Sequence, residues 1–355
     1  MPIIILLLLL SLGAHSKTLP ASNFKATQDF VQKMVDKHQF DQGELLSIFA
    51  SIELPVAEKT TQKKTKKTTK RKPMSWDRYR ALFLTQNRID AGVEFWQENQ
   101  ALLTRAQNKY NVPAQIIVAI LGIETNYGDK QGTHPTLQAI AQRAFSNHRR
   151  KKFYTKELED FLLLVRENNI APLQVKGSYA GALGYAQFIP SSYRHYAIDF
   201  DNDKQVDLFN SRADAIGSIA NYFDKHHWHD GGEIAYPITL DSAYLKHAKR
   251  GTNKPKKTAQ YWRQQGIQIA NNIDDKTKVA FVRLPQDQRV DTYLTLWNFY
   301  VLTRYNHDNR YAMAAYQLSK EIYKSYQQTN NPWLTQPSYW KKPHSYWLFS
   351  PQSWA

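Results

Sequence analysis

The chain has 355 residues, enough for a large core and two or three structural units, and it carries a formal net charge of +16. It holds no cysteine, which excludes a disulfide framework and leaves no cysteine to carry a bacterial lipid anchor. The basic excess favours an anionic partner, either a polymer or a membrane surface.

Residues 1–16, MPIIILLLLLSLGAHS, have the pattern of a secretory signal peptide. The apolar run is short for a bilayer span, and Ala14-His15-Ser16 offers a small-x-small cleavage site. Because no Lys or Arg precedes the apolar run, an uncleaved anchor is the alternative. We expect an exported protein that is soluble or loosely held at a surface.

Residues 17–56 predict a small pair of helices. Phe30 and Met34 fall on one amphipathic period, and Asp41 and Gly43 then interrupt the pattern. We therefore expect an N-terminal helical segment ahead of the next, very different stretch.

Residues 57–74 predict a solvated linker. Its tract Lys59–Lys72, KTTQKKTKKTTKRK, holds eight basic residues and no acidic one, which is half of the net charge. Nucleic acid is a conceivable partner for such a tract. For an exported protein, weak electrostatic contact with an anionic polymer or membrane surface fits better.

Residues 75–325 are expected to form the main domain, and its best-defined element lies within 111–128, NVPAQIIVAILGIETNYG. Asn111 can cap a helix, and Pro113 suits a first turn, where its missing N–H needs no partner. Almost every residue from 116 to 123 is apolar, so this helix is expected to be buried on most of its circumference.

Glu124 follows this apolar run and shares the helical face of Ile117 and Ile120. It also lies near the helix C-terminus, where the macrodipole opposes a negative charge. Burial and the dipole both favour the protonated form, which a general acid near neutral pH requires. The alternative is a carboxylate that reaches solvent or pairs with an arginine.

The pattern stays helical from 135 to 168, with a strongly amphipathic segment at 158–165. Arg149 and Arg150 precede that segment, and a solvated basic face is their default interpretation. The next stretch, 176–193, is KGSYAGALGYAQFIPSSY.

Six glycine and alanine residues lie between Gly177 and Ala186, too many for an ordinary surface helix. They indicate close backbone approach to a helix or to a ligand. Gln187 is the polar exception. The alternative is a tight helix–helix contact in which the backbone satisfies Gln187.

The stretch 199–214 begins DFDNDKQVDLFN and resembles an EF-hand calcium loop. Two departures matter: Lys204 stands where the loop has glycine, and Asn210 stands where it has a bidentate glutamate. Asp214 could supply the missing carboxylate. The alternative is a surface turn rich in aspartate and asparagine.

The remaining stretches complete a mainly helical pattern with a small β-containing excursion. Helix is expected at 211–223 and at 297–323, the latter interrupted at 305–309, and short β runs are expected at 238–240, 279–284 and 292–296. The histidines at 226–229 have no second ligand cluster that would indicate zinc. Residues 326–355 form an aromatic C-terminal tail without an assigned function.

With these motifs in place, the chain resembles the membrane-bound lytic murein transglycosylase B family. The motifs that carry the resemblance are IIVAILGIETNYG (116–128), KGSYAGALGYAQFIPSSY (176–193), DFDNDKQVDLFNSRADAIGSIANYF (199–223) and NFYVLTRYNHDNRYAMAAYQL (298–318). The resemblance implies a mainly α (α+β) fold, in which a lysozyme-like catalytic core adjoins an α-helical domain and a small β-containing excursion.

The resemblance also implies which residues form the site. Glu124 matches the catalytic glutamate. The positions that match sugar-contacting and cleft-lining residues are Ser178, Gln187, Tyr222, Tyr305, Asn306 and Tyr311, with the paired arginines Arg149 and Arg150. The positions that match the calcium loop are Asp199, Asp201, Asp203, Gln205 and Asp214.

The activity implied is lytic cleavage of the β-1,4 bond between N-acetylmuramic acid and N-acetylglucosamine, with formation of 1,6-anhydro ends. The alternatives are a hydrolytic muramidase and a non-catalytic peptidoglycan-binding protein. The resemblance implies a periplasmic monomer that acts on glycan strands and not on nucleic acid. No cofactor is expected for the chemistry, and Ca²⁺ is expected in a structural role.

Overall fold

The computed structural model describes residues 18–55, 74–229, 231, 233–249, 251 and 253–330. The predicted leader, the basic tract Lys59–Lys72 and residues 331–355 of the aromatic tail lie outside this part of the chain. Within it, no helix combines the length and the apolar character that a membrane crossing requires.

Helices make up most of the described structure, as the sequence predicts. The helices are α1 (Lys25–His38), α2 (Gln42–Ala50), α3 (Trp76–Ala81), α4 (Gln86–Glu98), α5 (Gln100–Tyr110), α6 (Ala114–Thr125), α7 (Thr136–Phe145), α8 (Lys151–Glu167), α9 (Pro190–Tyr196), α10 (Arg212–Lys225), α11 (Ala259–Gln264), α12 (Trp297–Tyr305) and α13 (Asn309–Asn330), with 3-10 turns η1 (Ala21–Asn23) and η2 (Ser242–His247). The predicted breaks between α1 and α2 and between α12 and α13 are both confirmed.

The strands are short and form three small sheets. They are β1 (Thr18–Pro20), β2 (Glu53–Pro55), β3 (His134–Pro135), β4 (Lys176–Gly177), β5 (Ala235–Pro237), β6 (Ala248–Lys249), β7 (Lys257–Thr258), β8 (Lys278–Pro285) and β9 (Val290–Thr295). The first two pairs are antiparallel, and the main sheet has the order β5-β9-β8-β6, with β7 beside β8.

The predicted β-containing excursion is confirmed, with one shift in position. The hairpin β8–β9 pairs Ala280 with Thr295 and Pro285 with Val290. The prediction of a first β run at 238–240 is wrong by three residues, because the strand is Ala235–Pro237. Of the predicted run, Ile238 alone continues the pairing, since its N–H donates to the carbonyl of Thr292.

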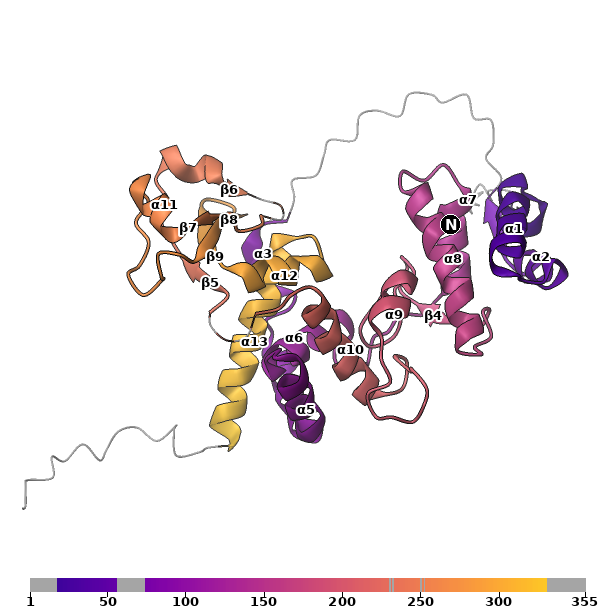
Figure 1. The fold of residues 1–355 in the computed structure, drawn as a ribbon, viewed down its shortest axis with the longest axis horizontal. Helices are drawn as coiled ribbons and strands as arrows, with labels where there is room; N and C mark the ends of the chain where they lie inside the picture. The colour runs from indigo at the N-terminus through magenta and orange to yellow at the C-terminus, as the bar shows by residue number, and fades with distance from the viewer. Residues whose placement is uncertain are drawn as a thin grey trace, which may run out of the picture.

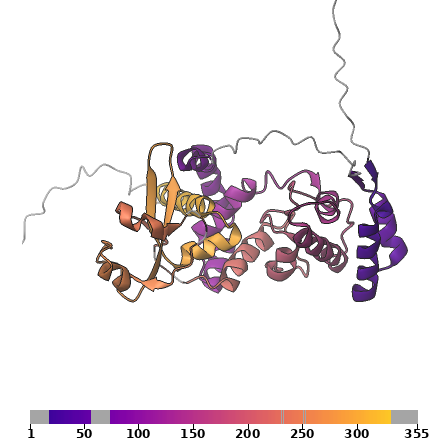
Figure 2. The same ribbon diagram turned by 90° about the horizontal axis from the view of Figure 1, so that it is seen from above.

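The apolar side chains form one large core and one small core. The large core extends from α1 and α2 through α6 to α13, so the N-terminal segment and the main domain share it. The small core lies within the excursion, where Phe281 and Leu294 pack with side chains of η2 and α11 and of the segments around them. Figures 1 and 2 show the sheet at one end of the molecule and α1–α2 at the other.

Helix α6 occupies the middle of the large core. It packs against α4, α5, α10 and α13, and Figure 1 shows it between α13 and α10. Ile117, Ile120 and Leu121 have no exposed surface, as the apolar run predicts. Complete burial of such a side chain contributes about 1.5–3 kcal/mol. The position of Glu124 is therefore fixed by packing on every side of its helix.

The stretch 176–189 is not a helix. It forms a short strand, turns and a bridge between Leu183 and Phe188 before α9 begins. The predicted close backbone approach is confirmed: a Cβ on Gly184, whose φ is +62°, would lie 2.2 Å from the carbonyl oxygen of Leu208. The small residues thus allow this segment to pack directly on the loop that precedes α10.

The N-terminal helices are joined to α8 by a charged cluster as well as by apolar packing. Glu159 accepts hydrogen bonds from Lys33 (2.5 Å), Lys37 (2.8 Å) and His38 (2.7 Å). Burial alone would raise the pKa of Glu159, but the three hydrogen bonds lower it to about 2.

We expect Glu159→Gln to lower the free energy of unfolding at neutral pH by about 2 kcal/mol, because the three donors lose a charged acceptor. A carboxylate with a lowered folded-state pKa stabilises the fold fully above its ordinary pKa of 4.5, and the stabilisation is lost as the pH falls toward about 2. Urea unfolding should therefore show the difference between wild type and variant shrinking below about pH 4.5. Glu44→Gln, at an exposed position, is the control; a difference that grows on acidification would contradict the expectation.

Candidate active site

The start of α6 differs from the sequence-based expectation. Asn111 does not cap it: this residue ends α5 in a left-handed conformation (φ 54°), and Pro113 occupies the N-cap position. The first N–H of the helix, from Ala114, is instead bonded to the side-chain oxygen of Gln107 (2.9 Å). The amide that replaces the expected cap comes from the preceding helix, which local sequence signals do not reveal.

The end of α6 is fixed by two left-handed residues. Asn126 and Tyr127 have φ values of 51° and 61°, and their N–H groups bond back to Gly122 and Leu121. This termination places Glu124 in the last turn, as predicted. The Tyr127 hydroxyl donates to the carbonyl of Arg88 (2.7 Å) and ties the turn to α4.

The Glu124 side chain is closely surrounded by protein yet keeps part of its surface accessible. Burial raises its pKa from 4.5 to about 7, although a hydrogen bond from Tyr311 acts in the opposite direction. The Tyr311 hydroxyl donates to Oε1 across 2.5 Å. Among the described residues no lysine, arginine or histidine pairs with Glu124, so the alternative of an arginine-paired carboxylate is wrong.

Three predicted tyrosines lie in a connected row that ends at Glu124. The rings of Tyr222 and Tyr305 are 4.9 Å apart, and those of Tyr305 and Tyr311 are 6.4 Å apart and nearly parallel. The Tyr305 hydroxyl donates to the carbonyl of Ala186 (2.6 Å). Burial raises the pKa of Tyr305 and of Tyr311 well above 10, so both remain neutral hydroxyls at physiological pH.

Gln187 and Ser178 are both engaged with backbone. Gln187 has a left-handed conformation (φ 47°), and its side-chain N–H group donates to the carbonyls of Gln131 (3.0 Å) and Gly184 (2.9 Å). The Ser178 hydroxyl accepts the N–H of Ala182 (2.9 Å). Tyr305 reaches the residue before Gln187, so this turn lies beside the tyrosine row.

The arginine pair and Asn306 lie at the surface. The Arg150 guanidinium lies 3.9 Å from the centre of the Phe153 ring. The pKa of His307 is lowered mainly by burial, and then by the positive charges of Arg304 and Arg150. Arg149 is exposed, and so is Asn306, whose carbonyl accepts the N–H of Asp308.

Tyr79 is a site neighbour that the sequence did not reveal. Burial raises its pKa to about 12, with further contributions from the charges of Asp308 and Glu124 and an opposing one from Arg310. It lies on α3, outside all four motifs, and no local pattern distinguishes it from a core aromatic residue.

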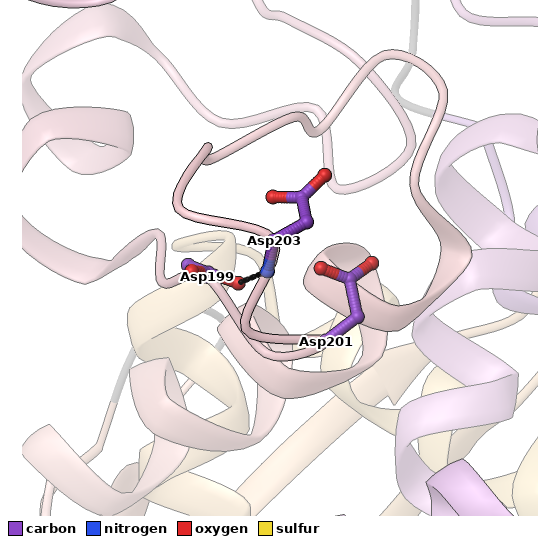
Figure 3. A group of neighbouring side chains, drawn as sticks. All are labelled: Asp199, Asp201 and Asp203. Carbon is purple, nitrogen blue, oxygen red and sulfur yellow. Dashed lines mark hydrogen bonds between the residues drawn. The ribbon is translucent and has the colours of Figure 1, made fainter.

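The predicted metal loop gathers three carboxylates. Asp199, Asp201 and Asp203 each offer an oxygen within 4.8 Å of the others, and Figure 3 shows them around one turn. Asp199 accepts the N–H of Asp203 (3.2 Å) and of Lys204 (2.8 Å). Lys204 takes the left-handed conformation (φ 73°) that glycine provides in an EF-hand, so its side chain does not prevent the turn.

The other two residues expected to bind the metal, Asp214 and Gln205, already form hydrogen bonds within the loop. The two oxygens of Asp214 accept the N–H groups of Phe200 (2.7 Å) and Asp207 (2.8 Å), so this buried carboxylate closes the loop onto α10. Gln205 donates its N–H to Asp203 (2.8 Å). In the described structure no cation pairs with Asp199, Asp201 or Asp203, and such a cluster of oxygen donors fits a hard cation.

The fold defines the class of this protein: a mainly helical, lysozyme-like enzyme. The chain belongs to the family described as "Transglycosylase SLT domain", whose model matches residues 23–320. It is thus a lytic murein transglycosylase, a lyase that acts on peptidoglycan.

Its relatives include membrane-bound lytic murein transglycosylase B of Escherichia coli (strain K12), 36% identical over 306 residues, which are 85% of this chain and 83% of the relative. The catenated lytic transglycosylase SltB1 from Pseudomonas aeruginosa has a TM-score of 0.77 and 34% identity, over 86% of this chain and 99% of that chain. The Escherichia coli lytic transglycosylase Slt35, solved in complex with calcium, has a TM-score of 0.72 and 34% identity, over 86% and 95% of the two chains.

Proposed function

We propose that this enzyme cleaves the β-1,4 bond between N-acetylmuramic acid and N-acetylglucosamine with Glu124 as its single acid–base group, leaving 1,6-anhydro-N-acetylmuramic acid ends. The observation that carries the proposal is the enclosed position of the Glu124 carboxyl group in the last turn of α6, because this burial raises its pKa to about 7. Such a group is protonated in a large fraction of molecules at neutral pH, and it can take a proton back once it has given one.

The reaction proceeds in two proton transfers. Glu124 gives its proton to the bridging oxygen as the bond from C1 of muramic acid to that oxygen breaks, which leaves an oxocarbenium-like centre. The carboxylate then accepts the proton of the C6 hydroxyl of the same sugar, whose oxygen forms the new bond to C1. Glu124 ends protonated, and no water is consumed.

A single carboxylate suffices because the nucleophile belongs to the substrate. Glycosidases of the hydrolytic classes place a second carboxylate about 5–9.5 Å across the bond. An intramolecular hydroxyl reaches a high effective molarity without that help. Burial and the Tyr311 hydrogen bond account for the pKa of Glu124, with no contribution from an acidic neighbour in the described part of the chain.

We assign the other predicted positions to the glycan. In this proposal Tyr311 orients the carboxyl group, and the sugar-contacting positions are Ser178, Gln187, Tyr222, Tyr305, Asn306, Arg149 and Arg150. A relative supports the product: SltB3 from Pseudomonas aeruginosa, with 25% identity, a TM-score of 0.69 and coverage of 84% and 78%, is solved in complex with NAG-anhNAM-pentapeptide.

We also propose that the 199–214 loop binds Ca²⁺ in a structural role through Asp199, Asp201 and Asp203, with the Gln205 carbonyl. Asp214 then stabilises the loop without binding the metal, since both of its oxygens accept backbone N–H groups of the loop. The calcium complex of Slt35 supports the choice of metal. The proposed location is the periplasm, reached through the leader at 1–16, and the enzyme acts there as a monomer on glycan strands.

We expect Glu124→Gln to lower the rate of sacculus digestion by about 100- to 10,000-fold, because glutamine cannot donate a proton to the leaving oxygen. Mass spectrometry of the released muropeptides should show anhydro ends from wild type. Glu157→Gln is a matched control, since Glu157 is also buried with a raised pKa but accepts hydrogen bonds from Ser191, which is not one of the positions assigned to the site. Reducing muropeptides from wild type would identify a hydrolytic muramidase, and an active Glu124→Gln variant would refute the role of Glu124.

We expect millimolar Ca²⁺ to raise the melting temperature by a few degrees, because a ligand that binds only the folded state stabilises it. Asp201→Asn should abolish the rise while leaving the fold intact, because the exposed Asp201 side chain accepts a hydrogen bond from Ser211 alone among the described residues. Thermal unfolding with Ca²⁺, Mg²⁺ or NaCl at matched ionic strength is the measurement. If Ca²⁺ acts no differently from NaCl, the loop does not bind it.

A further inference from the structure

The positive charge of the chain is concentrated in two segments that lie far apart in the sequence. The tract 59–72 holds eight basic residues and no acidic one, and the stretch 246–278 holds nine basic residues and two acidic ones. Together they account for nearly all of the net charge of +16. Neither segment contains a position assigned to Glu124 chemistry or to the glycan, so the proposed reaction leaves this charge unexplained.

The stretch 246–278 belongs to the β-containing excursion, and its lysines are exposed. Lys249 lies in β6, the edge strand of the main sheet, Lys257 lies in β7, and Lys278 begins β8 opposite Thr258. Figure 1 shows β6, β7 and α11 on the side of the excursion that faces away from α6. The exposed lysines of this stretch, which we refer to as the excursion lysines, are Lys246, Lys249, Lys254, Lys256, Lys257, Lys276 and Lys278.

Acidic side chains do not neutralise the excursion lysines. Within the described ranges, none of the seven forms an ion pair. The two acidic residues of the stretch have other partners, since Asp275 pairs with Arg263 and Asp274 accepts the N–H of Lys276 (2.8 Å). The excursion therefore presents an uncompensated positive surface, which attracts anions over a long range.

The basic tract joins the described structure beside this surface. Met74, the first described residue after the tract, accepts a hydrogen bond from Arg310 through its carbonyl (3.2 Å). Arg310 pairs with Asp308, and Asp308 forms a backbone bridge with Gly251, between β6 and β7. Met74 and Gly251 also line the same hollow. The fold thus attaches the second basic segment next to the first, where their charges act on the same partner.

Aromatic rings lie among the excursion lysines. The Lys257 ammonium is 4.7 Å from the centre of the Tyr261 ring, and the Lys254 ammonium is 5.1 Å from Trp297 and 5.6 Å from Tyr300. Tyr261, on α11, is 37% exposed. Lysine next to tyrosine and tryptophan is typical of surfaces that meet lipid headgroups, where the ammonium groups lie at the phosphates and the rings enter the interface. Charge alone would serve any anionic polymer, and the rings favour a lipid surface.

We propose that the excursion lysines dock this enzyme on an anionic membrane surface by binding the phosphate groups of its lipids, with Tyr261 at the level of the headgroups. Several lysines are needed, because each contributes only about a fivefold factor to binding near an anionic surface. The attraction extends over about 8 Å at physiological ionic strength, so the docking is reversible and sensitive to salt. It requires neither Glu124 nor a glycan, and it is therefore independent of the proposed function.

The test is co-sedimentation of residues 17–355 with lipid vesicles, which omits the predicted leader so that the leader itself does not bind lipid. Vesicles that contain phosphatidylglycerol should bind the protein, vesicles of phosphatidylcholine alone should not, and added NaCl should weaken the binding. Partitioning onto the anionic vesicles should fall about 100-fold in the triple variant Lys254→Gln, Lys256→Gln and Lys257→Gln, which removes three adjacent excursion lysines.

A second triple variant controls for net charge, because it removes the same number of exposed lysines from α1, α5 and α13. It should bind the vesicles as wild type does, and both variants should digest sacculi at the wild-type rate. This control consists of Lys25→Gln, Lys109→Gln and Lys324→Gln.

An equal loss of vesicle binding in the two triple variants, or equal binding of wild type to both kinds of vesicle, would overturn the proposal. So would a first variant that keeps vesicle binding and loses binding to sacculi, since the excursion lysines would then bind the wall. If the first variant does not fold, Lys246→Gln with Lys276→Gln provides a second test, with a loss of about 25-fold expected. Vesicles contain no glycan, so failure of the proposed function would leave these results unchanged.

Discussion

The contact between the carboxyl group of Glu124 and the hydroxyl of Tyr311 is the interaction on which the proposed chemistry depends. Desolvation raises the pKa of the carboxyl group, and the hydrogen bond limits that rise, so the two opposing effects leave it at about 7. A weaker desolvation would leave an ordinary ionised carboxylate. Without the tyrosine, the pKa of Glu124 would rise further above its ordinary value.

Three segments far apart in the sequence create this environment. The apolar α6 supplies the carboxyl group, the break between α12 and α13 brings Tyr305 and Tyr311 onto it, and the turn around Gln187 closes against Tyr305. Gly184 lets the backbone of this turn pack directly on Leu208, in the loop before α10. The fold is thus built so that packing, rather than a charged partner, controls the protonation of Glu124.

Sequence patterns predicted the parts of this arrangement that depend on local structure. The apolar period of α6 placed Glu124 correctly, and the interruption at 305–309 was visible as a break in the helical pattern. Contacts across the fold were not predictable in the same way. Tyr79 approaches from α3 with no distinguishing motif, Gln107 caps α6 in place of Asn111, and Lys204 adopts a conformation that its residue type disfavours. These features depend on tertiary packing, which overrides local preference.

The dependence of kcat/KM on pH, measured with sacculi for wild type and Tyr311→Phe, tests the central claim most directly, because this ratio reports the ionisation of the free enzyme. Tyr316→Phe is the control, since it removes a tyrosine–glutamate hydrogen bond, to Glu233, away from the site. We predict that wild-type activity falls as the pH rises through about 7 and that Tyr311→Phe moves this fall to higher pH, because the hydrogen bond lowers the pKa of Glu124. A fall near the ordinary carboxyl value of 4.5, or a shift to lower pH in Tyr311→Phe, would contradict the account.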